Sequence, residues 1–297
     1  MRLWELRSGV SLFLLVIWGG CAMLNERPRI SYTHDQFRTE VRERVPELAA
    51  QEIPVLFEVD RRAIALARAV TDRAPRGHPR IVALVDMLHE PPPQGLGLRY
   101  KSTTTQNAAE TLKLGEGNCV ALASVFVGLG RGLGWPVYFG EALIRDEEIR
   151  REEDLAIRAD HMVVVIVAQT VKAVVDFTGP VEGYGVNVID DIHAYAHLLN
   201  NQASERILAD MENGGTADWE GALEGFSLAT KLMPEMARGW NNRGVALARL
   251  GRLDAARDSY ARALQVDASM GSPQQNLVVL ETRSRGTTSI QQQPTNR

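Results

Sequence analysis

The 297-residue sequence predicts an α+β domain, made of helices and an antiparallel sheet, followed by an all-α segment of helical repeats. Three observations support this division. Apolar residues recur at helical spacing between Asp35 and Glu90, two β-branched runs occupy 161–167 and 171–177, and similar residues recur 34 positions apart in the last third. The length exceeds that of one average domain and agrees with two folded units.

The first twenty residues have the pattern of an export signal. Two arginines precede a short apolar run at 10–18, and Gly19 and Gly20 follow as small residues before a cleavage point. The run is too short to cross a bilayer, which takes about twenty apolar residues. The sequence therefore predicts a signal peptide at 1–20.

Cys21 follows directly, so this segment resembles a bacterial lipoprotein signal, in which the processed N-terminal cysteine carries lipid. The resemblance implies a lipidated cysteine with a tether at 21–34 and a membrane anchor in the cell envelope. Because Ala22 rather than Asp follows the cysteine, it implies the outer membrane, facing the periplasm. An ordinary cleaved signal or an uncleaved anchor is the alternative.

The middle of the chain reads as helices, then a buried helix, then strands. Two or three helices are expected up to Glu90, and a further helix at 108–114 follows a loop rich in Pro and Gly. Asn118 is a suitable N-cap for an apolar helix that starts at Cys119 and ends near Gly134. A strand is expected at 137–143, and the charged stretch 145–158 reads as a solvated surface segment.

The last third has the spacing of paired helices. Ala222, Phe226 and Ala229 recur as Ala256, Tyr260 and Ala263 at an offset of 34 residues. This pattern resembles tetratricopeptide repeats. We expect two repeats with a capping helix over 191–285 and a disordered tail at 286–297. The resemblance implies a protein partner for the repeats.

Cys119 stands where a helix start favours a reactive thiolate. The first turn of a helix offers unpaired backbone N–H groups and the positive end of the helix dipole. A reactive cysteine also needs a histidine as proton partner and a third group to orient the imidazole. His161 opens one predicted strand and Asp176 ends the next, so a tight hairpin would bring these two together.

The pairing register of the hairpin tests this arrangement. If Val167 pairs with Thr170, His161 stands opposite Asp176. A turn that begins one residue later places Asp176 opposite Val163, still on the His161 face but diagonal to it. A three-residue loop would place the two side chains on opposite faces unless a bulge intervened. The arrangement therefore predicts an even loop.

The motifs GEGNC, DHMVVV and VVDFTG, in this order, together resemble the transglutaminase-like superfamily of cysteine enzymes, whose fold is papain-like. The upstream stretch TTTQNAAETLKL also looks like members of that group. The resemblance covers about 35–190, which we take as the catalytic domain. It implies that Cys119 is the nucleophile, His161 the general base and acid, and Asp176 the orienting carboxylate.

Other residues near these motifs are open to more than one interpretation. The backbone N–H of Cys119 is the first candidate donor to an oxyanion, and Tyr100 or Asn118 is the second. Tyr100 is equally compatible with an ordinary packed aromatic. Asp160 could replace Asp176, but neighbouring residues on a strand point to opposite faces.

Charge and metal-ligand spacing narrow the class of function. A net charge of −4 offers no basic surface for nucleic acid. His193 and His197 are one helical turn apart, and Asp190 precedes them, but HAYAH lacks the glutamate of a zinc protease helix and no third histidine is near. We expect no metal and no cofactor.

The expected function is an envelope-anchored cysteine peptidase or amidase that works through Cys119, His161 and Asp176. An amine acceptor in place of water would make it an acyltransferase, and a cell-wall peptidase is a further variant. The alternative of a different class is a non-catalytic, lipid-anchored scaffold that acts through its repeats.

Overall fold

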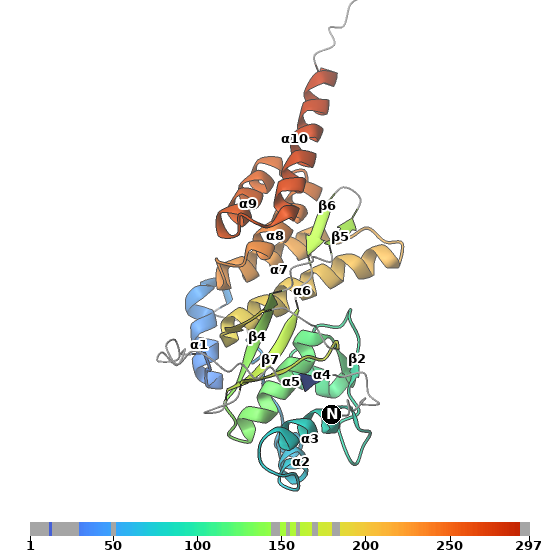
Figure 1. Cartoon of the computed structure of the whole chain (residues 1–297). Helices are drawn as coiled ribbons and strands as arrows, with labels where there is room; N and C mark the ends of the chain where they lie inside the picture. The colour runs from blue at the N-terminus through green and yellow to red at the C-terminus, as the bar shows by residue number, and fades with distance from the viewer. Residues whose placement is uncertain are drawn as a thin grey trace, which may run out of the picture. The chain divides into compact units, whose positions relative to one another are not determined.

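In the computed structural model the chain forms two compact units (Figure 1). The first comprises Met1–Arg145 and Asp160–Leu198, and the second Asp146–Ala159 and Leu199–Arg297. The structure describes residues 12–13, 30–48, 52–143, 149–152, 155–158, 161–167, 172–179 and 185–291. Within these ranges no helix combines the length and the apolar character that a membrane crossing needs. Cys21 and most of the expected signal and tether lie outside the described residues.

Three helices precede the reactive region, as predicted. They are α1 (His34–Arg44), α2 (Arg61–Thr71) and α3 (His78–His89), with a short 3₁₀ turn η1 (Pro46–Leu48) after the first. Thr33 and Gln36 form a reciprocal capping box at the start of α1. Asp60 caps α2 by accepting a hydrogen bond from the Ala63 N–H at 2.7 Å.

The central helix of the first unit is α5 (Cys119–Gly132). All its residues from Cys119 to Gly130 are buried, which confirms the expected core helix. Helix α4 (Ala108–Leu114) and a two-residue parallel pairing of β2 (Arg99–Tyr100) with β3 (Glu116–Gly117) lead into it.

An antiparallel sheet packs beside α5. Its order is β1 (Leu12–Phe13), β8 (Lys172–Val175), β7 (Met162–Val167), β4 (Val137–Leu143) and β9 (Gly185–Ile189). Strands β4 and β7 both contact α5, so the sheet and this helix share one core. The predicted strand at 137–143 and the predicted hairpin are present, whereas β9 was not anticipated.

The register of β7 and β8 is the second of the two that the sequence allowed. Val164 pairs with Val175, and Val167 pairs with Lys172. Continued by one residue, this register sets Asp176 opposite Val163, diagonal to His161. The even loop is therefore confirmed.

The charged stretch after β4 contains two short strands. β5 (Ile149–Glu152) pairs antiparallel with β6 (Leu155–Arg158), and both belong to the second unit. We expected this segment to be a solvated excursion. The high charge of this segment gives no strand signal in the sequence. The strands form nevertheless, because β propensity depends on the surface that a strand packs against.

The second unit consists of paired helices. They are α6 (Asp191–Glu212), which begins in the first unit, and α7 (Trp219–Leu232), α8 (Ala237–Arg249), α9 (Leu253–Val266) and α10 (Gly271–Gln291). The repeated small and aromatic positions are buried on α7 and α9, which pack on α8. Gly244 is required because a Cβ there would lie 2.4 Å from the Tyr260 ring.

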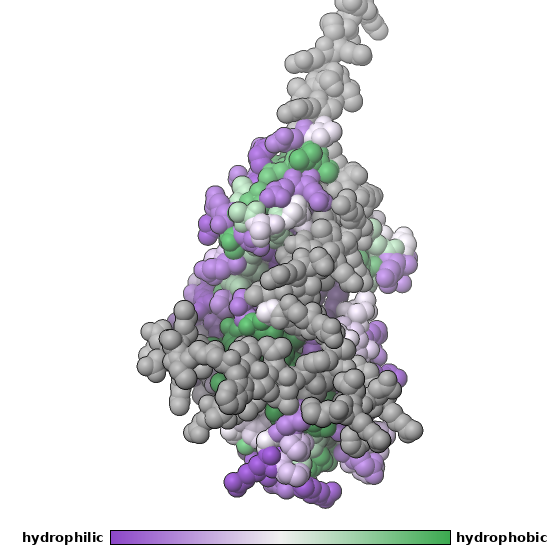
Figure 2. All heavy atoms as spheres, viewed as in Figure 1, coloured by the Kyte–Doolittle hydropathy of each residue, from purple (hydrophilic) through white to green (hydrophobic). Residues whose placement is uncertain are grey.

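The capping helix α10 continues to Gln291, into the segment that we expected to be disordered from 286. Gln, Thr and Ser carry only small helix penalties, so composition alone does not end the helix there. On the face seen in Figure 2, hydrophilic and hydrophobic residues are interspersed over the described surface. The large exposed apolar side chains in the described ranges are Tyr100, Leu114, Met211 and Val278.

Candidate active site

Two glycines of the GEGNC motif shape the approach to Cys119. Gly115 ends α4 in the left-handed conformation at φ 74°, which glycine adopts without steric cost. Gly117 lies so close to the first turn of α5 that a Cβ would stand 2.5 Å from the Ala121 Cβ. The motif therefore turns the chain sharply and holds it against the helix that Cys119 begins.

Asn118 caps this helix. Its Oδ1 accepts hydrogen bonds from the backbone N–H groups of Val120 and Ala121 at 3.1 and 3.2 Å, and its Nδ2 donates to the Thr105 hydroxyl. Through these hydrogen bonds the side-chain amide of Asn118 fixes the start of the helix. Cys119 is the first residue of α5 and is only 5% exposed.

The structure brings His161 and Asp176 together. His161 directly precedes β7 and Asp176 directly follows β8, and the His161 Nε2 lies 2.8 Å from Asp176 Oδ2. Both side chains are nearly buried, with 10% and 7% of their surface exposed. The diagonal register thus places the carboxylate within hydrogen-bond reach of the imidazole.

Cys119 also forms a hydrogen bond with His161. Burial acts most strongly on the ring and lowers its pKa, but the hydrogen bonds and negative charges of Asp176 and Cys119 together raise the pKa of His161 to about 10. The surroundings of His161 therefore favour its charged imidazolium form.

Thr178 is a site residue that the sequence analysis did not single out. Its backbone N–H and its hydroxyl both donate to Asp176 Oδ1 at 2.8 Å, and its Oγ1 lies 3.4 Å from His161 Nε2. The signal was present, because Asp followed two residues later by Thr is typical of a turn closed by the aspartate side chain.

Phe177 packs the end of β8 against two helices. Its ring centroid lies 6.2 Å from that of Phe126 on α5 and 6.4 Å from that of His89 on α3. These contacts fix the segment that carries Asp176 relative to the helix that carries Cys119.

Tyr100 lies beside the chain that leads to Cys119. It pairs with Gly117 in the β2–β3 register, and the Lys101 N–H donates to the Gly117 carbonyl at 2.9 Å. The Tyr100 residue is 43% exposed. The oxyanion roles of Tyr100 and Asn118 stay predictions.

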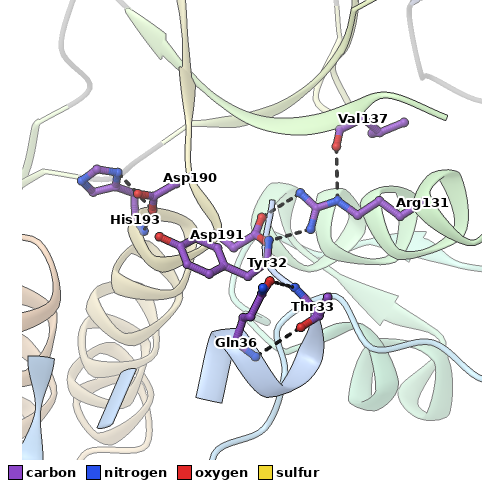
Figure 3. A network of polar contacts seen from close by, with 8 residues as sticks. All are labelled: Tyr32, Thr33, Gln36, Arg131, Val137, Asp190, Asp191 and His193. Atoms are coloured by element: carbon purple, nitrogen blue, oxygen red, sulfur yellow. Dashed lines mark hydrogen bonds and ion pairs between the residues drawn. The ribbon is translucent and has the colours of Figure 1, made fainter. Parts of the chain in front are cut away.

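A buried ion pair holds the far end of α5 (Figure 3). Both terminal nitrogens of Arg131 donate to the Asp191 carboxylate at 2.8 Å, and the Tyr32 backbone N–H donates to the same carboxylate at 2.9 Å. The Arg131 guanidinium also lies over the Phe57 ring at 4.6 Å. Burial raises the pKa of Asp191, and its hydrogen bond and ion pair with Arg131 oppose this shift.

The two histidines that follow β9 have different surroundings. His193 Nδ1 lies 3.2 Å from Asp190 Oδ1 (Figure 3), whereas His197 is 1% exposed within α6. Among the described residues, no group of three or more His, Cys, Asp or Glu side chains is arranged to hold a metal ion.

Two family models match the chain. Residues 64–202 match the transglutaminase-like superfamily, and residues 237–269 match the tetratricopeptide repeat. The first match contains Cys119, His161 and Asp176, and the second covers α8 and α9.

Curated relatives match short stretches only. A heat shock protein sti1 homolog of Schizosaccharomyces pombe is 44% identical over 52 residues, which are 18% of this chain and 9% of that protein. An uncharacterised protein of Methanocaldococcus jannaschii is 40% identical over 57 residues, 19% of this chain and 66% of that protein. The chain thus spans less than a tenth of the first relative and about two thirds of the second.

Fold, motif order and family matches agree: this chain carries a domain of the transglutaminase-like superfamily, followed by a tetratricopeptide repeat.

Proposed function

We propose that this protein is an envelope-anchored cysteine enzyme that hydrolyses amide bonds of proteins or peptides. The observation that carries the proposal is the hydrogen-bonded series Cys119–His161–Asp176, in which Cys119 is the first residue of a buried helix. A thiol, an imidazole and an oriented carboxylate in this order are the groups that nucleophilic acyl transfer requires.

In the first half-reaction the Cys119 thiolate attacks the amide carbon, and the carbonyl oxygen takes the negative charge. We assign the Cys119 backbone N–H, at the start of the helix, as a donor to this oxygen. His161 then gives its proton to the leaving amine as the C–N bond breaks, which leaves a thioester. Asp176 keeps the ring oriented and favours its charged form.

In the second half-reaction His161 takes a proton from water, which attacks the thioester and releases the acid and the thiolate. An amine in place of water would form a new amide by the same steps. Hydrolysis is the simpler assignment, because water needs no second binding site.

The pH dependence of Cys119 alkylation tests this proposal. A soluble chain that begins at residue 22 contains Cys119 as its single cysteine. Iodoacetamide should react with it readily at pH 6 to 7, and His161→Ala should slow the reaction at pH 7 at least tenfold. His193→Ala is the matched control and should leave the rate unchanged.

Equal rates in both variants would favour the second candidate, a scaffold without catalysis. The observation that favours this candidate is the repeat segment, since stacked helix pairs are protein-binding surfaces. A turnover assay on a peptide library also distinguishes the two candidates. An enzyme that acts through Cys119 should lose all cleavage activity in the Cys119→Ser variant.

We further propose that lipid on Cys21 anchors the chain in the outer membrane, facing the periplasm. The support is the order of charged, apolar and small residues before Cys21 and the Ala22 that follows it. Cys21→Ser should abolish incorporation of labelled palmitate and move the protein out of the membrane fraction, whereas Cys119→Ser should stay in it. Retention of Cys21→Ser in that fraction would point to another anchor.

A further inference from the structure

The β5–β6 hairpin belongs to the repeat unit, although it lies in the chain inside the transglutaminase-like domain. It stands between β4 and β7 of the first unit, yet Asp146–Ala159 groups with the repeats. Strand β6 contacts α8 and α10 (Figure 1). We call the side of α8 and α10 that meets β6 the inner face of the repeats.

The hairpin needs such a surface to form. Each of its strands has four residues, and an isolated two-stranded hairpin is marginally stable in water. The two residues between Glu152 and Leu155 in the sequence are Glu and Asp, rather than the Asn-Gly or Asp-Gly pairs that favour a tight turn. Contacts with the helices must supply the missing stability.

The burial of α8 agrees with a covered inner face. Successive helical residues turn by about 100°, so seven consecutive residues make about two turns and sample every side of the helix. On α8, six of the seven residues from 241 to 247 are buried: Asn241, Asn242, Gly244, Val245, Ala246 and Leu247. Core residues of α6, α7, α9 and α10 lie in one cluster with those of α8, and β6 also contacts α8.

A chain of buried amides makes the inner face rigid. Asn276 Nδ2 donates to Asn241 Oδ1 at 3.0 Å, Asn241 Nδ2 to Asn242 Oδ1 at 3.3 Å, and Asn242 Nδ2 to Asn200 Oδ1 at 3.1 Å. All four side chains are fully buried. The chain joins α6, α8 and α10, so their spacing is set before anything binds.

The hairpin is rooted at His161. The Ala142 N–H donates to the His161 carbonyl at 3.1 Å, next to the Glu141–Met162 pair at the end of the β4–β7 ladder. The chain leaves the sheet after this point and returns to it at His161, three residues after Arg158. Only two residues separate Arg158, the last residue of β6, from His161 in the sequence, so the hairpin and the imidazole are joined by a short stretch of chain.

We propose that the inner face of the repeats binds the β5–β6 hairpin of its own chain and thereby restrains His161. A protein partner that takes this face must displace the hairpin, so that binding at the repeats reduces reactivity at Cys119. The effect on reactivity rests on the proposed function, whereas the binding does not.

Binding is tested on the full chain with residues 146–159 replaced by a Gly-Ser segment of equal length. A fluorescein-labelled cyclic peptide of residues 145–159 should bind this variant at least tenfold more tightly than it binds the intact chain, measured by anisotropy. Equal affinity for both proteins, or no binding to a variant that still melts cooperatively, overturns the proposal.

If the Gly-Ser variant does not fold, amide hydrogen exchange tests whether the hairpin covers α8. Leu155→Asp with Ile157→Asp should speed amide exchange in α8 at least tenfold, because β6 loses its apolar residues. Val278→Asp is the control, since Val278 is 65% exposed on α10. Unchanged exchange of α8 in the β6 variant contradicts the proposed cover.

The link to His161 has its own measurement. Alkylation of Cys119 at pH 7 should be at least threefold slower in the Gly-Ser variant than in the intact chain. If His161→Ala slows alkylation but the Gly-Ser variant does not, the link is wrong and the proposed function stands. If neither change matters, the proposed function itself fails.

Discussion

At the scale of single residues, the hydroxyl of Thr178 orients the Asp176 carboxylate. Thr178→Val removes one of the two hydrogen bonds to Asp176 Oδ1 and keeps the other, from the backbone. A less restrained carboxylate holds the imidazolium less well, so we expect Cys119 alkylation at pH 7 to fall about three- to tenfold. Rates measured from pH 5 to 10 provide the readout.

A serine at position 178 shows whether the effect comes from the hydroxyl that orients Asp176 or from the size of the side chain. Thr178→Ser keeps the hydroxyl and should retain the rate profile of the unaltered protein. If Val and Ser variants both match that profile, Thr178 has no positioning role.

The raised pKa of His161 also predicts how stability depends on pH. The folded value of about 10 lies above the unfolded value of 6.5, so the charged ring stabilises the fold fully below pH 6.5. This stabilisation is lost as the pH rises from 6.5 towards 10. Urea unfolding at pH 6, 8 and 10 should show a decline of the unfolding free energy that is smaller in His161→Gln. A decline of the same size in both proteins would count against a charged ring.

At the scale of elements, the contact between Gly117 and α5 controls where Cys119 lies. Gly117→Ala places a methyl group 2.5 Å from the Ala121 Cβ, so the first turn of the helix must shift. We expect a loss of about 1–3 kcal/mol in unfolding free energy and slower Cys119 alkylation. Gly271→Ala is the control, because a Cβ there meets no atom within 4 Å.

The Arg131–Asp191 pair ties the other end of α5 to the start of α6. Asp191→Asn leaves a nearly buried guanidinium without its counter-charge, which should cost about 3–5 kcal/mol in urea unfolding. The exposed pair of Asp35 with Arg38 is the comparison, and Asp35→Asn should cost less than about 1 kcal/mol. Similar losses in the two variants would mean that the buried pair adds little.

At the scale of the whole molecule, the sequence predicts those features that local chemistry determines. The N-cap at Asn118, the burial of α5, the β-branched runs of β7 and β8 and the repeated positions of α7 and α9 follow from spacing and residue type. The register was limited to two choices that keep His161 and Asp176 on one face. The structure selected the diagonal one.

Other features depend on contacts that no local pattern encodes. Strand β9 carries Gly and Asn among its five residues and is stabilised by pairing with β4. The β5–β6 hairpin is highly charged, and β6 contacts α8 and α10, which begin 79 and 113 residues after β6 ends. The buried Arg131–Asp191 pair likewise joins residues sixty positions apart.

The two units are interleaved in the chain, because Asp146–Ala159 belongs to the second unit but lies in the sequence between the two parts of the first. No single cut can therefore release either one intact. A fragment that stops at residue 198 keeps the hairpin but lacks the helices on which it packs, and one that starts at 199 lacks the hairpin. During synthesis, the ribosome also delivers β6 long before α10, so the contacts between these two elements form only after α10 has been made.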